Sequence, residues 1–488
     1  MAVAVKEHHS KFEYERHKPE QSLLYQTIQR YWSSFVAHCE EQNRPVPAFV
    51  KREFEAFLRC GILDYGFARV YCQGCQYDRL VAFSCKRRGF CGSCLSRRMS
   101  ETASRLTDSL IPNIPTRQWV LSLPTPLRYL VAYDNEALNF VVTTFISVLF
   151  SYLRRKAKKS GGVALGADSY YPGSVTFIQR FGSACNLNVH LHSQVSNGVY
   201  IKYGDGKLRF IKIGNPSQQD IKQITLKIAE CMHCYLESRI GECNNEFLLK
   251  EPLLAQCYEA SIRYLSAFGD KAGQPLIRLI STDLIQEQRH EENTIMGFNL
   301  HASKAIEGDD RESLENILRY MGRPPLASHR LNLAADRENL ILTLKSPWRD
   351  GTEKILLSPF DLIQRLVSLV PYPRKNLVRY HGFLGPNAHV RTEILGISGR
   401  TAENPSLKIS RPSFVELMSK VFGIDLLQCP RCHSRMQIIS YIHDRRVVKK
   451  ILESLKMSTA PPSICRPKEY QVFYEEGANS HVEEWVSP

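Results

Sequence analysis

The stretch "NLNVHLHSQVSNGVY", residues 186–200, alternates between apolar and polar residues, which is typical of a β-strand with one buried face. Valines and a leucine occupy one face, and the opposite face carries His190, His192 and Gln194. Two imidazoles on one side of a strand can chelate a metal ion, or they can form a polar face without any ligand. Residue chemistry alone leaves the metal open between zinc, iron, nickel, manganese and magnesium. The stretch therefore predicts a strand that carries a candidate metal site, with Gln194 as a third polar ligand.

The segments around this strand predict its structural setting. A short strand is expected in "RQWVLSLP", residues 117–124, and further strand-like runs lie on both sides of the histidines. The apolar run at residues 137–153 contains Asn, Thr and Ser, so we expect a buried helix rather than a membrane span. Strands and helices mix without a regular βαβ rhythm. The central part of the chain is therefore expected to be α+β, with a mainly antiparallel sheet flanked by helices.

The overall composition indicates a folded, intracellular protein with a polyanionic partner. The 488 residues carry a formal net charge of +15, and 43% of them are hydrophobic, which excludes a disordered chain. The first residues do not resemble a secretory signal peptide, because their apolar run is short and charge follows at once. We therefore expect reduced cysteines that bind metal, and nucleic acid as the first candidate partner.

A cysteine-dense segment follows the N-terminal helical region. Its spacing is Cys72-x2-Cys75-x9-Cys85-x5-Cys91-x2-Cys94, and two C-x2-C knuckles at this separation are typical of a structural zinc site. The expected ligands are Cys72, Cys75, Cys91 and Cys94, and Cys85 is able to replace one of them. Basic residues between and after these cysteines suit phosphate contacts, and the candidates for DNA binding are Lys86, Arg87, Arg88, Arg97 and Arg98.

Two more C-x2-C pairs carry weaker signals. Cys231 and Cys234 lie in a helical stretch, which favours burial or coincidence over metal binding. Cys429 and Cys432 have the turn chemistry of a zinc knuckle, but no second pair follows them in the chain. Their role stays open at the level of the sequence.

A candidate nucleophile lies on a helix expected at residues 311–321. An aspartate precedes this helix as a cap, and Gly322 and the following prolines end it. Tyr320 lies off the apolar stripe of the helix, with Arg319 and Arg323 nearby on its polar side. A tyrosine can attack a phosphate and form a covalent link, so Tyr320 is one candidate and Tyr380, in "LVRYHGFLGP", is its rival.

The histidine motif resembles that of the HUH endonucleases, which are named for a His-hydrophobe-His trio. Five longer stretches are similar to bacterial rolling-circle insertion-sequence transposases that have an N-terminal zinc-binding domain, a group that includes the common-region elements. They occur in that family's order between about residues 50 and 440: "FLRCGILDYGFARVYCQGC", "FSCKRRGFCGSCLSRRM", "RQWVLSLPTPLRYL", "RYMGRPPLA" and "LVRYHGFLGPNAHVR".

This resemblance implies a mechanism. His190 and His192 would hold Mg²⁺ or Mn²⁺ at the scissile phosphate of single-stranded DNA, at the ends of the mobile element and at the target. Tyr320 would form a 5′-phosphotyrosine link and leave a free 3′-hydroxyl. Many members carry a second tyrosine four residues earlier, where this chain has Asn316, so a single-tyrosine chemistry is expected. Gln194, His301 and Asn316 remain alternatives for the third metal ligand. Arg319 and Arg323 are expected to contact DNA.

The resemblance also implies a domain organisation. We expect a helical and zinc-binding DNA-recognition domain at residues 1–105, an HUH transposase domain at residues 106–400, and a C-terminal region at residues 401–488 that ends in a loose tail. Zn²⁺ is the expected structural cofactor, and the protein is expected at the nucleoid in a bacterial cytoplasm, without a membrane partner. The alternatives are a plasmid-type replication initiator or relaxase, and a non-enzymatic zinc DNA-binding protein derived from a transposase.

Overall fold

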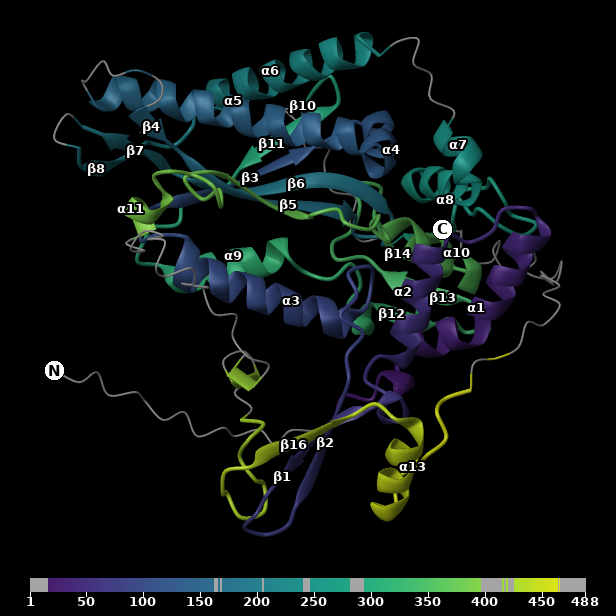
Figure 1. The fold of residues 1–488 in the computed structure, drawn as a ribbon. Coiled ribbons are helices and arrows are strands. Elements are labelled where there is room, and N and C mark those ends of the chain that lie inside the picture. The colour runs from purple at the N-terminus through teal and green to yellow at the C-terminus, as the bar shows by residue number, and fades with distance from the viewer. Residues whose placement is uncertain are drawn as a thin grey trace, which may run out of the picture.

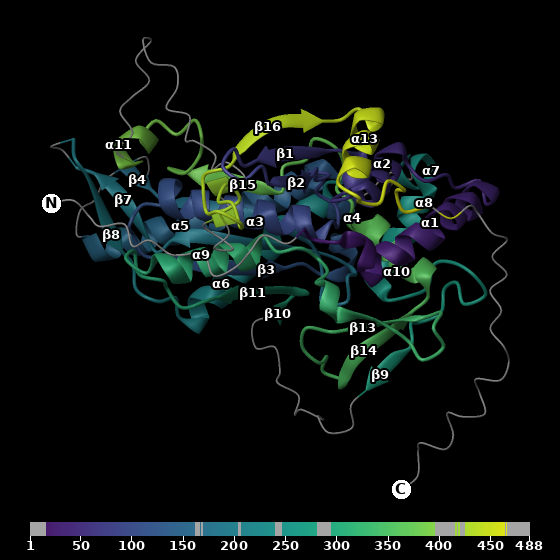
Figure 2. The ribbon, with the colours of Figure 1, turned by 90° about the horizontal axis from the view of Figure 1, so that it is seen from below.

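The computed structural model shows a central sheet between two layers of helices, with a smaller β-unit attached (Figures 1 and 2). It describes residues 16–161, 166, 169–203, 206–239, 246–280, 294–395, 415–416, 418–419, 425–463 and 465. Most of the C-terminal tail that the sequence predicts to be loose lies outside these residues.

The central sheet has six strands in the order β10-β11-β3-β6-β5-β15, and every pairing is antiparallel. The strands are β10 (Thr294–Ile295), β11 (Phe298–Ala302), β3 (Thr116–Ser122), β6 (Leu187–Ser196), β5 (Gly173–Phe181) and β15 (Val378–Gly382). The stretch with the two histidines is β6, near the middle of the sheet. The α+β fold class expected from the sequence is confirmed.

Helices cover both faces of this sheet (Figure 1). One face packs on α4 (Thr125–Tyr133), α5 (Asn135–Gly161) and α6 (Gln218–Glu237), and the other on α3 (Gly92–Arg105) and α9 (Arg311–Met321). The alternation in β6 explains the arrangement. Val189 and Leu191 are fully buried in the core that includes α5, so the alternate residues, the histidines, face α9 and α3.

Helix α5 is the one described helix that is long and apolar enough to cross a membrane. Its candidate segment runs from Asn135 to Ser160, and 56% of its most apolar window is buried inside the protein. Contacts with α4, α6, β7 and β8 account for this burial. The helix is therefore a core element, as the polar residues in its sequence indicate.

A second group of elements packs at the end of the central sheet. Helices α1 (Leu23–Glu41), α2 (Ala48–Arg59), α8 (Pro252–Arg263) and α10 (Pro359–Leu369) contribute to the same large core. A four-stranded sheet beside them has the order β12-β13-β14-β9: β12 (Leu331–Leu333), β13 (Leu340–Thr343), β14 (Thr352–Leu357) and β9 (Arg278–Ile280). The remaining described elements are β4 (Tyr170–Tyr171), β7 (Gly198–Lys202), β8 (Leu208–Lys212), α7 (Glu246–Lys250), α11 (Arg391–Leu395), the 3₁₀-helices η1 (Pro19–Gln21), η2 (Leu63–Tyr65) and η5 (Ser328–Arg330), and the π-helix η3 (Leu106–Leu110).

A small three-stranded sheet joins the two ends of the chain. Its order is β16-β1-β2, with β1 (Phe67–Tyr71) between β2 (Asp78–Ala82) and β16 (Gln437–Ile442). Helix α13 (Arg445–Ser454) covers it with Val448 and Leu452. Figure 1 shows this unit below the central domain, with the C-terminal strand in yellow beside the N-terminal hairpin. Part of the C-terminal region thus folds together with the N-terminal domain.

Candidate metal and nucleophile site

The two histidines lie at the centre of the main sheet. His190 pairs with Ser122 of β3 and Gln179 of β5, and His192 is one step further along the same face. Their ring centroids are 4.8 Å apart. Since β6 is paired on both sides, and the register with β5 shifts only beyond Gln179, the backbone holds the two rings side by side on the face that meets α9.

Both imidazoles are neutral near pH 7, which is the state that binds metal. Burial lowers the pKa of His190 to about 4, against a smaller opposing effect of the Asn188 carbonyl. Burial, and next the neighbouring His190, lower the pKa of His192 to about 3. His190 Nδ1 donates to the Asn188 carbonyl over 2.8 Å, so its lone pair resides on Nε2. The Nε2 atom of His192 is buried and has no hydrogen-bond partner among the described residues.

Gln118, on β3, orients the second imidazole. Its Nε2 lies 3.1 Å from His192 Nδ1 and donates to it, which places the ring proton on the unpartnered Nε2. A half-turn of the amide would present the carbonyl oxygen instead, move the ring proton to Nδ1 and free the Nε2 lone pair for a metal. Gln118 therefore governs which tautomer His192 adopts, and the sequence did not single it out.

Tyr320 lies beside the histidines at the end of α9. The expected helix is confirmed: Asp310 caps its start by accepting from the Ser313 amide over 3.0 Å. Tyr320 is 37% exposed, and its ring packs edge-on against His192, with 6.1 Å between ring centroids. The side chain of Gln179 donates to the Met321 carbonyl over 2.8 Å, which ties the helix end to the strand opposite His190.

Two cations flank the Tyr320 ring. The Arg323 guanidinium lies 4.3 Å from the ring centroid and the Lys345 ammonium 4.2 Å. Burial raises the pKa of the Tyr320 phenol, but Arg323 and Lys345 together outweigh burial, and the pKa falls below its usual value. Lys345 lies in the turn between β13 and β14, far from Tyr320 in sequence, so no local pattern could have identified it. Arg319 instead pairs with Glu315 of its own helix over 2.7 Å.

The three alternatives for a third ligand occupy different places. Gln194 donates through Nε2 to Thr116 Oγ1 over 2.8 Å, while its Oε1 is buried and has no partner in the described part of the chain. His301 is exposed on β11, opposite Val120, which in turn is opposite His192. Two strand spacings, about 10 Å, therefore separate its backbone from that of His192. Asn316 is exposed one turn before Tyr320 on α9.

The rival tyrosine has a structural partner. Tyr380 lies on the edge strand β15, and its hydroxyl accepts from Arg105 of α3 over 2.8 Å. No ring contact joins it to either histidine among the residues described. Tyr320 is therefore the tyrosine that this structure brings to the histidine pair.

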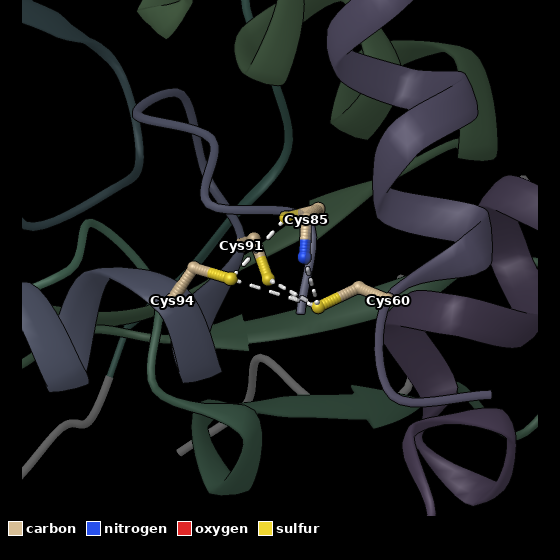
Figure 3. A group of neighbouring side chains, drawn as sticks. All are labelled: Cys60, Cys85, Cys91 and Cys94. Atoms are coloured by element: carbon tan, nitrogen blue, oxygen red, sulfur yellow. Dashed lines mark hydrogen bonds between the residues drawn. The ribbon is translucent and has the colours of Figure 1, made fainter. Parts of the chain in front are cut away.

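The cysteines form two clusters, where the sequence predicted one. Cys60, Cys85, Cys91 and Cys94 make the first cluster, with their sulfurs all within 4.8 Å of one another (Figure 3). Cys60 ends α2, and Cys91 caps the start of α3. Cys60 was missed because it stands alone, outside any C-x2-C pair. Cys85 belongs to this cluster as a full member.

Cys72 and Cys75 belong to a second cluster, with Cys429 and Cys432. The expectation of one site from Cys72, Cys75, Cys91 and Cys94 is therefore wrong. The reason is the β1–β2 hairpin: the Cys72 knuckle lies at its tip, and Cys85 follows its base. A five-residue strand spans about 16 Å, too far for one ion to bridge. Cys231 and Cys234, on α6, belong to neither cluster.

The basic residues predicted to contact DNA surround the first cluster. Lys86 and Arg98 are exposed, and Arg98 donates to the Lys86 carbonyl over 3.1 Å. Arg88 donates to the Lys375 carbonyl over 2.8 Å and so has a structural role as well. Arg87 and Arg97 are half-buried beside them. The structure thus concentrates this charge on the surface next to the first cysteine cluster.

Comparisons with known proteins agree with these features. The family described as "Transposase zinc-binding domain" matches residues 27–123, and the one described as "Putative transposase" matches residues 173–391. The transposase for insertion sequence element IS801 of Pseudomonas savastanoi pv. phaseolicola is 21% identical over 385 residues, which cover 78% of this chain and 80% of the relative. No solved structure matches the chain. The chain is therefore similar over most of its length to a transposase, and its cysteine clusters agree with the match to a zinc-binding domain.

Proposed function

We propose that the chain is a metal-dependent HUH transposase that nicks and rejoins single-stranded DNA through a covalent link to Tyr320. The contact between the Tyr320 and His192 rings, 6.1 Å between centroids, is the observation that supports this most directly. A nucleophile and a pair of neutral imidazoles from distant parts of the chain meet on one sheet face.

The residues of the site fit a catalytic cation. His190 would hold it, as would His192 once a turned Gln118 amide frees Nε2, and Gln194 would be the third ligand through its buried Oε1, which has no partner among the described residues. Mg²⁺ or Mn²⁺ bound there would polarise the phosphate and stabilise the charge that develops on it. With so few protein ligands, coordination positions remain for a phosphate oxygen. This openness is what a nuclease requires.

The chain's own residues account for the covalent step. The Tyr320 oxygen forms a bond to the scissile phosphorus and loses its proton to solvent, and the bond from phosphorus to the 3′ oxygen breaks. That oxygen takes a proton and leaves as a free 3′-hydroxyl, while the 5′ end stays on Tyr320. Arg323 and Lys345 favour the phenolate. One guanidinium nitrogen of Arg323, Nη1, is buried without an acceptor among the described residues, so it is available to a phosphate oxygen.

Attack of a 3′-hydroxyl on the phosphotyrosine would reverse this step and join the strand to a target. The zinc-binding domain would recognise the element's ends through the basic residues around its first cluster, and Arg319 and Arg323 would contact DNA beside Tyr320. The proposed substrate is therefore single-stranded DNA at the element ends and at the target, in the bacterial nucleoid.

The decisive experiment is a covalent-adduct assay. The full chain is incubated with Mn²⁺ and single-stranded oligonucleotides from the ends of its own element, and then run on a denaturing gel. We expect an adduct from the unmodified chain and from Tyr380→Phe, and none from Tyr320→Phe. An adduct that persists in Tyr320→Phe contradicts the nucleophile. Absence of an adduct with every end sequence favours the non-enzymatic DNA-binding protein.

A further inference from the structure

The second cysteine cluster has the geometry of a metal site. Cys72 Sγ lies 3.4 Å from Cys432 Sγ, and Cys75 Sγ lies 3.5 Å from Cys429 Sγ. Four thiolates around a tetrahedral zinc at about 2.3 Å have sulfurs about 3.8 Å apart. The four thiols are free and not paired as disulfides. The cluster therefore needs only small adjustments to enclose one ion.

The backbones of the two knuckles follow the same turn. In each, the first cysteine's amide donates to the carbonyl five residues on, over 2.9 Å for Cys72 to Tyr77 and 3.0 Å for Cys429 to Ser434. In each, the residue four positions after that cysteine donates back to its carbonyl and has a positive φ, 60° at Gln76 and 57° at His433. Two segments far apart in sequence thus hold their thiols in the same backbone geometry, as expected of the two halves of a single site.

The surrounding contacts hold the two knuckles against each other. Strand β16, which follows the second knuckle, pairs with β1, which precedes the first, from Tyr71 opposite Gln437 to Phe67 opposite Ile442. Val70 and Met436 are buried with Cys72 and Cys429 in one small cluster. Such a core is too small to be stable by itself, so a bound metal would supply much of its folding energy.

We propose that Cys72, Cys75, Cys429 and Cys432 bind a second Zn²⁺, which fastens the C-terminal region to the N-terminal zinc-binding domain. Four thiolates fill a tetrahedral coordination sphere and leave no position for a substrate, so this ion is structural. The matched zinc-binding family ends at residue 123, so half of the site comes from outside it. The DNA-recognition domain is then complete only when residues 425–463 are present.

Zinc content tests the metal. We expect the purified full chain to hold two zinc ions, one for each cluster. Cys429→Ser/Cys432→Ser and Cys72→Ser/Cys75→Ser should each hold one, and so should Cys60→Ser/Cys85→Ser. The matched control is Cys231→Ser/Cys234→Ser, a C-x2-C pair outside both clusters, which should keep two. One zinc in the unmodified chain, or two in the Cys429→Ser/Cys432→Ser variant, overturns the proposal.

A cleavage experiment tests the fastening. A specific protease site is inserted between residues 400 and 414, and the cut protein is passed over a sizing column. We expect the C-terminal fragment to co-elute with the rest of the unmodified chain and of the Cys231→Ser/Cys234→Ser variant, and to separate in the Cys429→Ser/Cys432→Ser variant. Helical circular dichroism that matches the unmodified chain shows that the main domain is folded in each case. A fragment that stays bound without its cysteines contradicts the role of the ion.

Discussion

The histidine site and the cysteine clusters are opposite kinds of candidate metal site in one chain. Each cluster brings four thiols within 4.8 Å of one another, and four is the number of ligands that a tetrahedral structural zinc takes. The histidine site offers two imidazoles, a buried Nε2 and a buried amide oxygen without partners in the described part of the chain, and a tyrosine beside them. In a closed site protein ligands fill every coordination position, so the ion can only be structural. An open site leaves positions to which a phosphate can bind. The difference agrees with the proposal that the clusters are structural and that the histidines are catalytic.

The backbone around the two kinds of site differs as well. The histidines lie on a central strand paired on both sides, so regular backbone hydrogen bonding holds them in place. The cysteines lie at a hairpin tip, at helix ends and in knuckles, where little else fixes the chain. A catalytic site must exist before its metal arrives, and a structural site can be formed by its metal.

The largest expected effect would come from removing the imidazoles. His190→Ala and His192→Ala should each lower the rate of Mn²⁺-dependent adduct formation by roughly 10³-fold or more, since several kcal/mol of charge stabilisation is lost. Both variants should keep the zinc content of the unmodified chain, as should His233→Ala, an exposed control on α6 that should also keep the rate. Loss of zinc in His192→Ala would contradict the prediction that the histidine site and the cysteine clusters bind different ions.

Removal of a ligand from the first cluster should affect stability. Cys60 joins the end of α2 to the start of α3 through the proposed ion, so Cys60→Ser should lower the free energy of unfolding of the N-terminal domain by about 4 kcal/mol. Thermal unfolding followed together with zinc content measures this, and Cys234→Ser is the control. Unchanged stability after zinc loss would contradict a structural role for this cluster.

A smaller effect is expected at Gln118, which lies outside the proposed metal ligands. Gln118→Ala should weaken Mn²⁺ binding about 10- to 100-fold, because the turned amide would then no longer hold the ring proton of His192 on Nδ1 and leave Nε2 free for the metal. Titration of Mn²⁺ by calorimetry measures this, with zinc content as the internal control. Gln194→Ala tests whether Gln194 is a metal ligand. If it is, this variant should weaken Mn²⁺ binding more than Gln118→Ala does. An equal or smaller loss of affinity would show that Gln194 only lines the site.

The smallest effect concerns the cation over the tyrosine ring. Lys345 lowers the pKa of Tyr320, so Lys345→Met should raise it and leave less phenolate at neutral pH. The rate of adduct formation should fall by about tenfold or less at neutral pH, and the deficit should shrink as the pH rises through the pKa of the phenol. Lys354→Met, an exposed lysine on β14, is the control. A deficit that is constant across the pH range would assign Lys345 to DNA binding instead.

Local patterns in the sequence were sufficient to predict the two elements that carry the candidate site. Period-two alternation predicted β6 and the shared face of its histidines, and helical periodicity with an aspartate cap predicted α9 and the position of Tyr320 off its apolar stripe. These predictions succeeded because each depends on residues within a few positions of one another. The same patterns, taken over the whole chain, predicted the α+β class.

Only the tertiary structure decided which of these residues meet. Sequence spacing paired Cys72 and Cys75 with Cys91 and Cys94, but the β1–β2 hairpin separates them, and β16 brings Cys429 and Cys432 to the hairpin tip. Cys60, Gln118 and Lys345 carried no local signal, because each acts through a partner on another element. Spacing along the chain indicates which residues can bind or react, while strand pairing and packing across long separations determine their partners.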